Sequence, residues 1–180
     1  MKKIVILLIL AALVAPAMAQ SKSPYAGQEQ RSIKALSDED IRDLTEARGL
    51  GLAKAAELNS YPGPAHVLEL ADQIELSPTQ RTASKALVTA LRDKARPLGA
   101  RIIEAEWNLD RAFVEGRIDS ERLRSQVVAI GTLMGELRTL HLDAHIAQRA
   151  LLAPEQIARY DALRGYRAGG THPVNPQHRL

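Results

Sequence analysis

The sequence predicts an all-α protein built on a long antiparallel helical hairpin with short flanking helices. Hydrophobic residues make up 46% of its 180 residues but aromatic residues only 3%. The core must therefore consist of Leu, Ile, Val and Ala, which suits packed helices better than a β-sandwich. Two long stretches also repeat apolar residues at steps of three and four, as in the seam between two helices. The length corresponds to one domain.

The first arm of the hairpin is expected from Ser77 to Gly116. Ser77 is a favourable N-cap, Pro78 suits the first helical position, and Gln80 can complete a capping box. Pro97 lies inside this helix and is expected to kink it. The seam of this arm is predicted to comprise Leu91, Ala95, Leu98, Ile102, Ala105, Leu109 and Ala112.

The second arm is expected from Asp119, as N-cap, to Leu151. A short turn between two long helices makes an antiparallel hairpin. Among the flanking helices, one is expected from Ser37 to about Leu58, where Gly49 and Gly51 either permit close packing or break the helix. A short helix is predicted around 67–74, and a last helix is expected to end at Gly165.

The N-terminus has the pattern of a secretory signal peptide. Lys2 and Lys3 precede an apolar run, Ile4 to Val14, and Ala17-Met18-Ala19 is a cleavage site. The run is too short to favour the alternative of an uncleaved anchor. Cleavage after Ala19 and a periplasmic location are therefore predicted. The predicted organisation is a signal peptide (1–19), a flexible leader (20–36), a helical domain (37–165) and a disordered tail (166–180).

Composition excludes several classes of function. Cleavage would remove two of the 24 basic residues, leaving 22 against 21 acidic ones, which gives no electrostatic basis for nucleic-acid binding. The absence of Cys excludes disulfides, thiol catalysis and thiolate metal sites. No Gly-x-Ser-x-Gly elbow or phosphate-binding loop is present, so the protein is not expected to be an enzyme.

Histidines on the second arm are candidate metal ligands. His141 and His145 share one helical face, and Met134 lies two turns before His141. With a third ligand from elsewhere, such as His66, the pair could bind Zn, Cu, Ni or Co. Leu142 stands where a metalloprotease motif needs Glu. The alternative is a pair of partly buried histidines at a helix interface, with no cofactor.

Apolar residues outside the seam, interleaved with arginines, form a candidate surface for binding unfolded polypeptides. The alternatives are a dimer interface or a surface covered by the first helices. Trp107 and Phe113 are expected in the core or seam, with exposure as contacts for a bound polypeptide as the alternative. The candidate surface residues are Leu87, Arg92, Arg96, Arg101, Ile103, Arg111, Val114 and Val128.

Two pentapeptides carry a family resemblance. The segments 76–80 (Leu-Ser-Pro-Thr-Gln) and 152–156 (Leu-Ala-Pro-Glu-Gln) resemble the repeated Leu-Thr-x-x-Gln motif of the Spy/CpxP family, and 49–68, 141–145 and 160–166 resemble its heavy-metal-resistance branch. Ala153 replaces the motif's Thr, and loss of that cap costs about 1 kcal/mol. The motif residues are Leu76, Ser77, Gln80, Leu152, Pro154 and Gln156.

The resemblance implies an ATP-independent periplasmic chaperone or envelope-stress protein. Such a protein would bind unfolded or misfolded envelope proteins on a concave, Arg-rimmed apolar face, and it would be a homodimer. Two alternatives follow it: first a heavy-metal-binding sensor or resistance protein that uses His141 and His145, and then an adaptor that restrains a membrane sensor kinase.

Overall fold

The structure is a computed structural model that describes residues 23–166. The predicted signal peptide and almost all of the predicted tail lie outside this range. Residues 23–30 belong to a separate unit that holds the 3-10 helix η1 (Gln28–Gln30), and the remaining described residues form one helical body. The helices of this body are α1 (Asp38–Glu46), α2 (Lys54–Glu57), α3 (Pro64–Glu69), α4 (Pro78–Val114), α5 (Ser120–Ala150) and α6 (Pro154–Leu163).

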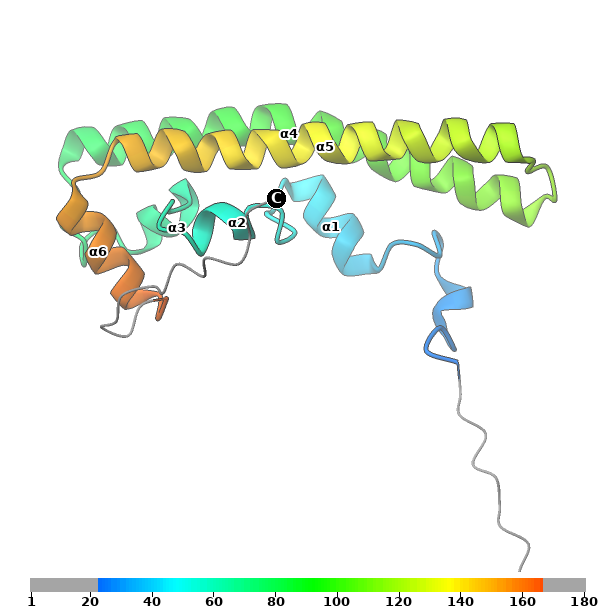
Figure 1. Cartoon of the computed structure of the whole chain (residues 1–180), viewed down its shortest axis with the longest axis horizontal. Coiled ribbons are helices and arrows are strands. Elements are labelled where there is room, and N and C mark those ends of the chain that lie inside the picture. The colour runs from blue at the N-terminus through cyan, green and yellow to red at the C-terminus, as the bar shows by residue number, and fades with distance from the viewer. Residues whose placement is uncertain (1–22, 167–180) are drawn as a thin grey trace, which may run out of the picture. The chain divides into compact units, whose positions relative to one another are not determined.

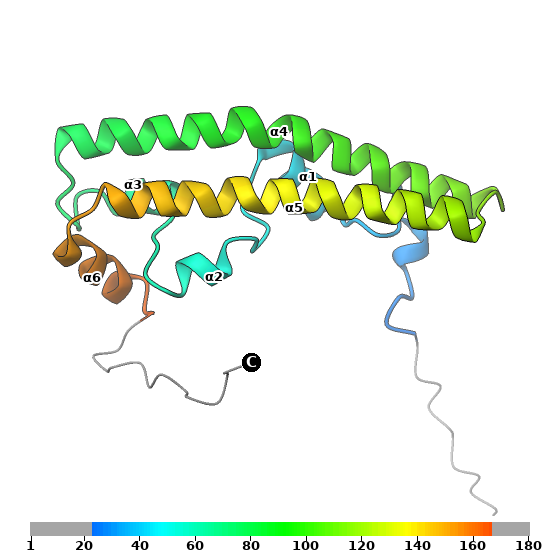
Figure 2. The same ribbon diagram turned by 45° about the horizontal axis from the view of Figure 1, so that its top comes forward.

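The predicted all-α hairpin is confirmed. Helices α4 and α5 run antiparallel side by side, and residues 23–166 contain no strand (Figures 1 and 2). No helix within this range is both long and apolar enough to cross a membrane. The helix α4 continues through Pro97 and bends near its middle (Figure 2), as a proline that removes one backbone donor requires. The main core cluster of the hairpin and α1 consists of Leu44, Ala47, Ala95, Ile102, Leu133 and Leu137.

The chain between residues 47 and 53 is not helical, so the glycine pair lies at a helix break. The helix α1 ends at Ala47, whose φ of 57° is left-handed, and Gly51 has a φ of 69°. A residue without a side chain adopts such a φ at little cost, which accounts for glycine at 51. Of the two alternatives left open for Gly49 and Gly51, the structure shows the helix break: two helices, α1 and α2, stand between Ser37 and Leu58, separated by residues with left-handed φ.

Helix α1 approaches α4 closely at Gly99. A Cβ atom on Gly99 would lie 2.1 Å from the carbonyl oxygen of Leu44. The two backbones can come this close only because position 99 lacks a side chain. Gly99 therefore fixes where α1 packs along the hairpin.

The predicted capping box of α4 is present. Ser77 Oγ accepts a hydrogen bond from the Gln80 N–H (3.2 Å), and Gln80 Oε1 accepts one from the Ser77 N–H (2.9 Å). At the start of α6, Gln156 Oε1 likewise accepts from the Ala153 N–H (2.9 Å), but Ala153 has no side-chain acceptor for the helix. The capping box of α6 therefore lacks the hydrogen bond to a side chain at position 153.

The two motif glutamines bind each other. Gln80 Nε2 donates to Gln156 Oε1 (2.8 Å), and Gln156 Nε2 donates to Gln80 Oε1 (3.0 Å). The same amides donate to the Leu151 and Ile74 carbonyl oxygens at 2.8 and 3.3 Å. The repeated pentapeptide thus caps two helices and joins their starts. This pairing docks α6 at its N-terminus despite the missing hydroxyl of Ala153.

A second apolar cluster holds α6 beside the start of α4 (Figure 1). Its largest member, Tyr160 of α6, is fully buried. The cluster spans α3, α6 and the segments around them, so it anchors α6 to the chain before the hairpin. It consists of Val67, Ala71, Ile74, Leu76, Leu152 and Tyr160.

Residues 31–36 are attached to the helical body, although the sequence places them in a flexible leader. Ile33 is buried. The Lys34 backbone N–H and ammonium donate to the Asp110 carboxylate, at 3.3 and 3.2 Å. The amphipathic periodicity that marks a helix is absent here, so the sequence gives no sign of this attachment.

Gly99→Ala is expected to destabilise the protein by about 1–3 kcal/mol or more, since the added methyl group would meet the Leu44 carbonyl. Urea unfolding followed by circular dichroism measures the change. Gly135→Ala in α5 is the matched control, because nothing lies within 4 Å of its Cβ position, and it should stabilise by up to about 1 kcal/mol. Equal stability of the two variants would contradict the close-packing argument.

Ala153→Ser is expected to stabilise the protein by about 1 kcal/mol, because Ala153 already has the extended backbone of an N-cap (φ −71°, ψ 153°) and lacks only the acceptor. The same unfolding assay checks it. Ala158→Ser, at an exposed position inside α6, is the control and should be neutral or slightly destabilising.

Candidate functional site

Three histidines line one cavity. His141 and His145 of α5 are both buried, with 4% and 8% of their surface exposed. They face His66 of α3 across a cavity of about 340 Å³. The structure therefore brings together the three histidines that the sequence nominated. The cavity is also lined by Glu46, Ala47, Arg48, Gly49, Gly63, Pro64, Ala65, Glu69, Val88, Leu91 and Arg92.

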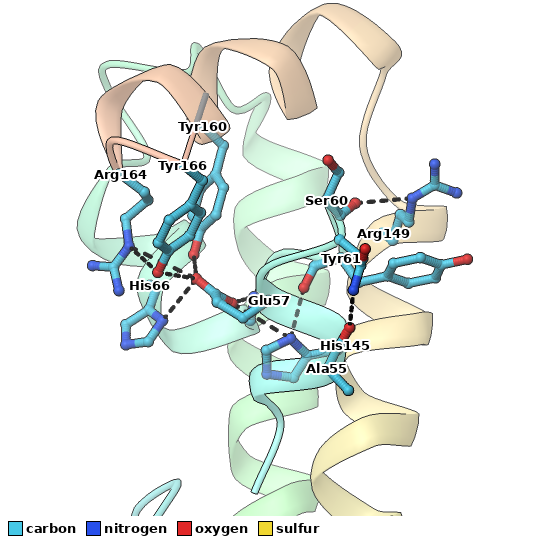
Figure 3. A network of polar contacts seen from close by, with 12 residues as sticks. Ala55, Glu57, Ser60, Tyr61, His66, His145, Arg149, Tyr160, Arg164 and Tyr166 are labelled. Atoms are coloured by element: carbon cyan, nitrogen blue, oxygen red, sulfur yellow. Dashed lines mark hydrogen bonds and ion pairs between the residues drawn. The ribbon is translucent and has the colours of Figure 1, made fainter. Parts of the chain in front are cut away.

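The ring of His145 is held by the loop after α2. Its Nδ1 donates to the Tyr61 carbonyl oxygen at 2.7 Å (Figure 3). A carbonyl oxygen only accepts, so in the neutral ring Nδ1 carries the proton and Nε2 keeps its lone pair. Gly63 makes room for this ring, since a Cβ there would lie 2.9 Å from Cε1 and 3.0 Å from Nε2. The loop thus fixes both the orientation and the tautomer of His145.

The same loop also contacts Arg149, one turn after His145 in α5, and it contacts α6. Arg149 Nε donates to the Ser60 carbonyl oxygen (3.0 Å), and its guanidinium lies over the Tyr61 ring, 4.5 Å from the centroid (Figure 3). Ser60 Oγ donates to Asp161 Oδ2 at 2.6 Å. These contacts connect the loop to two helices and hold Tyr61 where it meets His145.

Two ring nitrogens at the cavity have no hydrogen-bond partner among the described residues. They are His141 Nε2 and His66 Nδ1, and both atoms are buried. Burial, together with the neighbouring His145, lowers the pKa of His141, so its ring is neutral at pH 7. A buried polar atom without a partner is costly, and a neutral imidazole nitrogen is a ligand for a transition metal.

A carboxylate that the sequence analysis did not select stands beside these rings. Glu57 of α2 is 9% exposed, and Figure 3 shows it between the rings of His66 and His145. Its Oε1 lies 3.6 Å from His66 Nδ1, and its Oε2 lies 3.5 Å from His145 Nδ1. In the sequence Glu57 resembles any charged residue on an exposed helix face, so local patterning offers no signal for it.

Glu57 is surrounded by donors. The Gly63 N–H donates to Oε2 (3.1 Å), and the hydroxyls of Tyr160 and Tyr166 donate to Oε1, Tyr166 at 3.1 Å. Arg164 Nε lies 3.7 Å from Oε1. Burial acts to raise the pKa of Glu57, but His66, the Tyr160 hydroxyl and His145 outweigh it and lower that pKa to about 2. Burial and the Glu57 charge in turn raise the pKa of Tyr160.

The sequence was compared with models of known protein families. A sequence model of heavy-metal resistance proteins matches residues 62–159, more than half of the chain. The chain belongs to the heavy-metal resistance family. This family is related to the Spy/CpxP-like proteins, whereas membership of that narrower branch stays a prediction. No curated protein and no solved structure gave a significant match.

In this heavy-metal resistance protein the matched segment contains all three histidines of the cavity. Met134 does not line the cavity; it packs against the Leu44 core cluster. Within residues 23–166, no three His, Asp or Glu side chains stand close enough together to bind one ion as they are oriented. The ligand types fit a transition metal, and binding would require side-chain rotation to bring them together.

The candidate client surface is only partly exposed. Leu87 and Ile103 are half-buried, and Ile103 packs against the main core. Arg92 lines the histidine cavity, while Arg96 and Arg101 are exposed. The eight predicted residues therefore do not share one environment.

Apolar exposure concentrates instead at the turn of the hairpin. Val114 and Val128 are 57% and 62% exposed there. Trp107 and Phe113 are 48% and 56% exposed, so the expected core or seam packing is wrong for them and the alternative of exposed side chains holds. Arg111 lies over the Trp107 ring, 5.9 Å from its centroid, and forms an ion pair with Glu115.

The free energy of unfolding is expected to fall by about 3 kcal/mol between pH 5 and pH 2 through Glu57 alone. Its pKa of about 2 lies below the ordinary 4.5, so its contribution is complete above pH 4.5 and is lost as the pH falls towards 2. Urea unfolding at several pH values, compared with Glu57→Gln, isolates this contribution: the difference between the two proteins should shrink with falling pH. Glu104→Gln on the exposed side of α4 is the control. A constant difference would contradict the assignment.

Proposed function

We propose that this heavy-metal resistance protein binds a divalent transition-metal ion in the cavity between α3 and α5. The observation that carries the proposal is that His66, His141 and His145 line one cavity, where two buried ring nitrogens have no hydrogen-bond partner in the described structure. Family membership supports the same function.

The ligand chemistry narrows the class of ion. Imidazole nitrogen suits Zn, Cu, Ni and Co, whereas Mg and Ca prefer oxygen ligands. Thiolate is absent from the chain, which has no Cys. The three imidazoles would hold the ion, and Glu57 would supply a negative charge beside them. A bound ion of this kind acts as a Lewis acid and carries positive charge into the cavity.

The arrangement of His145 supports its role as a ligand. Histidines that bind metals usually donate their other N–H to a carbonyl or carboxylate, which fixes the ring. His145 makes such a bond to the Tyr61 carbonyl, so Nε2 is the nitrogen available to an ion. We place this function in the periplasm on the strength of the predicted signal peptide.

Metal binding is tested with the exported protein, purified after removal of metal with EDTA. Titration with Co²⁺, followed by visible absorption, and with Zn²⁺, followed by calorimetry, should show one site. His141→Ala and His66→Ala should each weaken binding by more than the roughly 10–100-fold that loss of an outer-shell partner costs. Circular dichroism checks that both variants fold. The His66 side chain is 42% exposed, so His66→Ala should disturb the packing less than His141→Ala.

The matched control removes His172 and His178, the two histidines outside the described residues. This double variant should bind like the wild type. Wild-type affinity in His141→Ala and His66→Ala, or loss of binding in the control, would overturn the proposal.

We propose polypeptide binding as a second function, because apolar side chains are exposed at the hairpin turn. Six large apolar residues between positions 107 and 128 are at least 38% exposed. Exposed apolar surface of this kind is typical of protein-binding sites. Suppression of the aggregation of an unfolded protein, measured by light scattering in EDTA without nucleotide, tests it; Phe113→Ser combined with Val128→Ser should abolish the suppression.

A further inference from the structure

The carboxylate of Glu57 connects the histidine cavity to α6. One oxygen, Oε1, accepts from the hydroxyls of Tyr160, within α6, and Tyr166, just beyond it. The other oxygen, Oε2, accepts from the Gly63 N–H and faces His145. Figure 3 shows the two tyrosines and His145 on opposite sides of this carboxylate. A change on either side therefore acts on the same group.

The two hydroxyls determine which way Glu57 turns. A buried carboxylate must satisfy both oxygens. With the hydroxyls in place, Oε1 is held towards α6. Without them, the nearest cationic or N–H groups to Oε1 are Arg164 (3.7 Å) and His66 (3.6 Å), neither within hydrogen-bond distance. The carboxylate would then rotate towards these groups, and the negative charge beside the rings of His66 and His145 would shift.

We infer that Tyr160 and Tyr166 are positioning residues for the metal site: they hold Glu57 beside His66 and His145, and docking of α6 is thereby linked to metal binding. This inference rests on the function proposed above. Carboxylates near a bound metal are themselves hydrogen-bonded, and loss of such partners typically costs 10–100-fold in affinity. Thermodynamic linkage then requires that the metal stabilise the docked α6 by the same factor.

The remaining contacts of α6 keep it folded in the variants needed for the test. The Gln80–Gln156 amide pair, the Ser60–Asp161 hydrogen bond and the apolar cluster around Tyr160 do not involve a tyrosine hydroxyl. Tyr→Phe substitution retains the aromatic ring in each case. Tyr166, which is only partly buried, provides a variant that tolerates substitution even if Tyr160→Phe does not fold.

The experiment measures Zn²⁺ affinity and amide hydrogen exchange in the exported protein. Tyr166→Phe should bind Zn²⁺ about tenfold more weakly, and Tyr160→Phe with Tyr166→Phe up to about 100-fold more weakly. In the wild type, saturating Zn²⁺ should slow exchange of the α6 amides by a similar factor, and in the double variant this slowing should disappear. Tyr25→Phe is the matched control, because Tyr25 is exposed, does not line the cavity and has no hydrogen bond from its hydroxyl in the described structure; it should behave like the wild type in both measurements.

The outcomes separate this inference from the proposed function. If wild-type protein binds no Zn²⁺, the proposed function fails and the inference fails with it. If the wild type binds Zn²⁺ but the phenylalanine variants bind it equally well, only the linkage is overturned. If Zn²⁺ leaves the amide exchange of α6 unchanged in the wild type, the linkage is overturned too. Weaker Zn²⁺ binding by the double variant, together with loss of the slowed exchange, supports the linkage.

Discussion

A buried carboxylate in a four-residue helix sets the main constraint on this structure. Leaving the charge of Glu57 unpaired in the interior would cost several kcal/mol, so it must be met by donors. Those donors come from the loop after α2, from α6 and from the residue at position 166, while two imidazoles from α3 and α5 stand beside it. Segments more than 100 residues apart in sequence are therefore drawn to one point.

The hairpin separates two kinds of surface. Near the start of α4 and the end of α5, the short helices and α6 lie against the hairpin (Figure 1), and the histidine cavity lies at this end. Near the α4–α5 turn, apolar side chains from Trp107 to Val128 stay exposed. The two proposed functions thus occupy opposite ends of the same pair of helices. Substitutions at one end should leave the other intact, because sites this far apart without shared partners behave additively.

Local sequence patterns predicted most of the fold. Seam periodicity located both arms of the hairpin, and the sequence around Ser77 contained the full cap that α4 uses. Helical spacing placed His141 and His145 on one face, and His66 was the third candidate. Local patterns could not reveal the Gln80–Gln156 pair or the role of Glu57, since each depends on partners more than 70 residues away. Periodicity likewise left the exposure of Trp107 open as an alternative, because it identifies an apolar face but does not identify what covers it.

The state of the three histidines bears on how tightly an ion would bind. Burial lowers the pKa of His141, so this ligand needs little free energy to lose a proton at pH 7, and the Tyr61 carbonyl holds the His145 ring in one orientation. Against this, the described side chains do not yet converge on one point, so part of the binding free energy must go into rotating them. The buried Nε2 of His141, which has no hydrogen-bond partner in the described structure, offsets some of that cost, because an ion would satisfy it. If an ion binds here as proposed, its affinity would depend on how Glu57 is held, because this carboxylate stands beside the rings of His66 and His145.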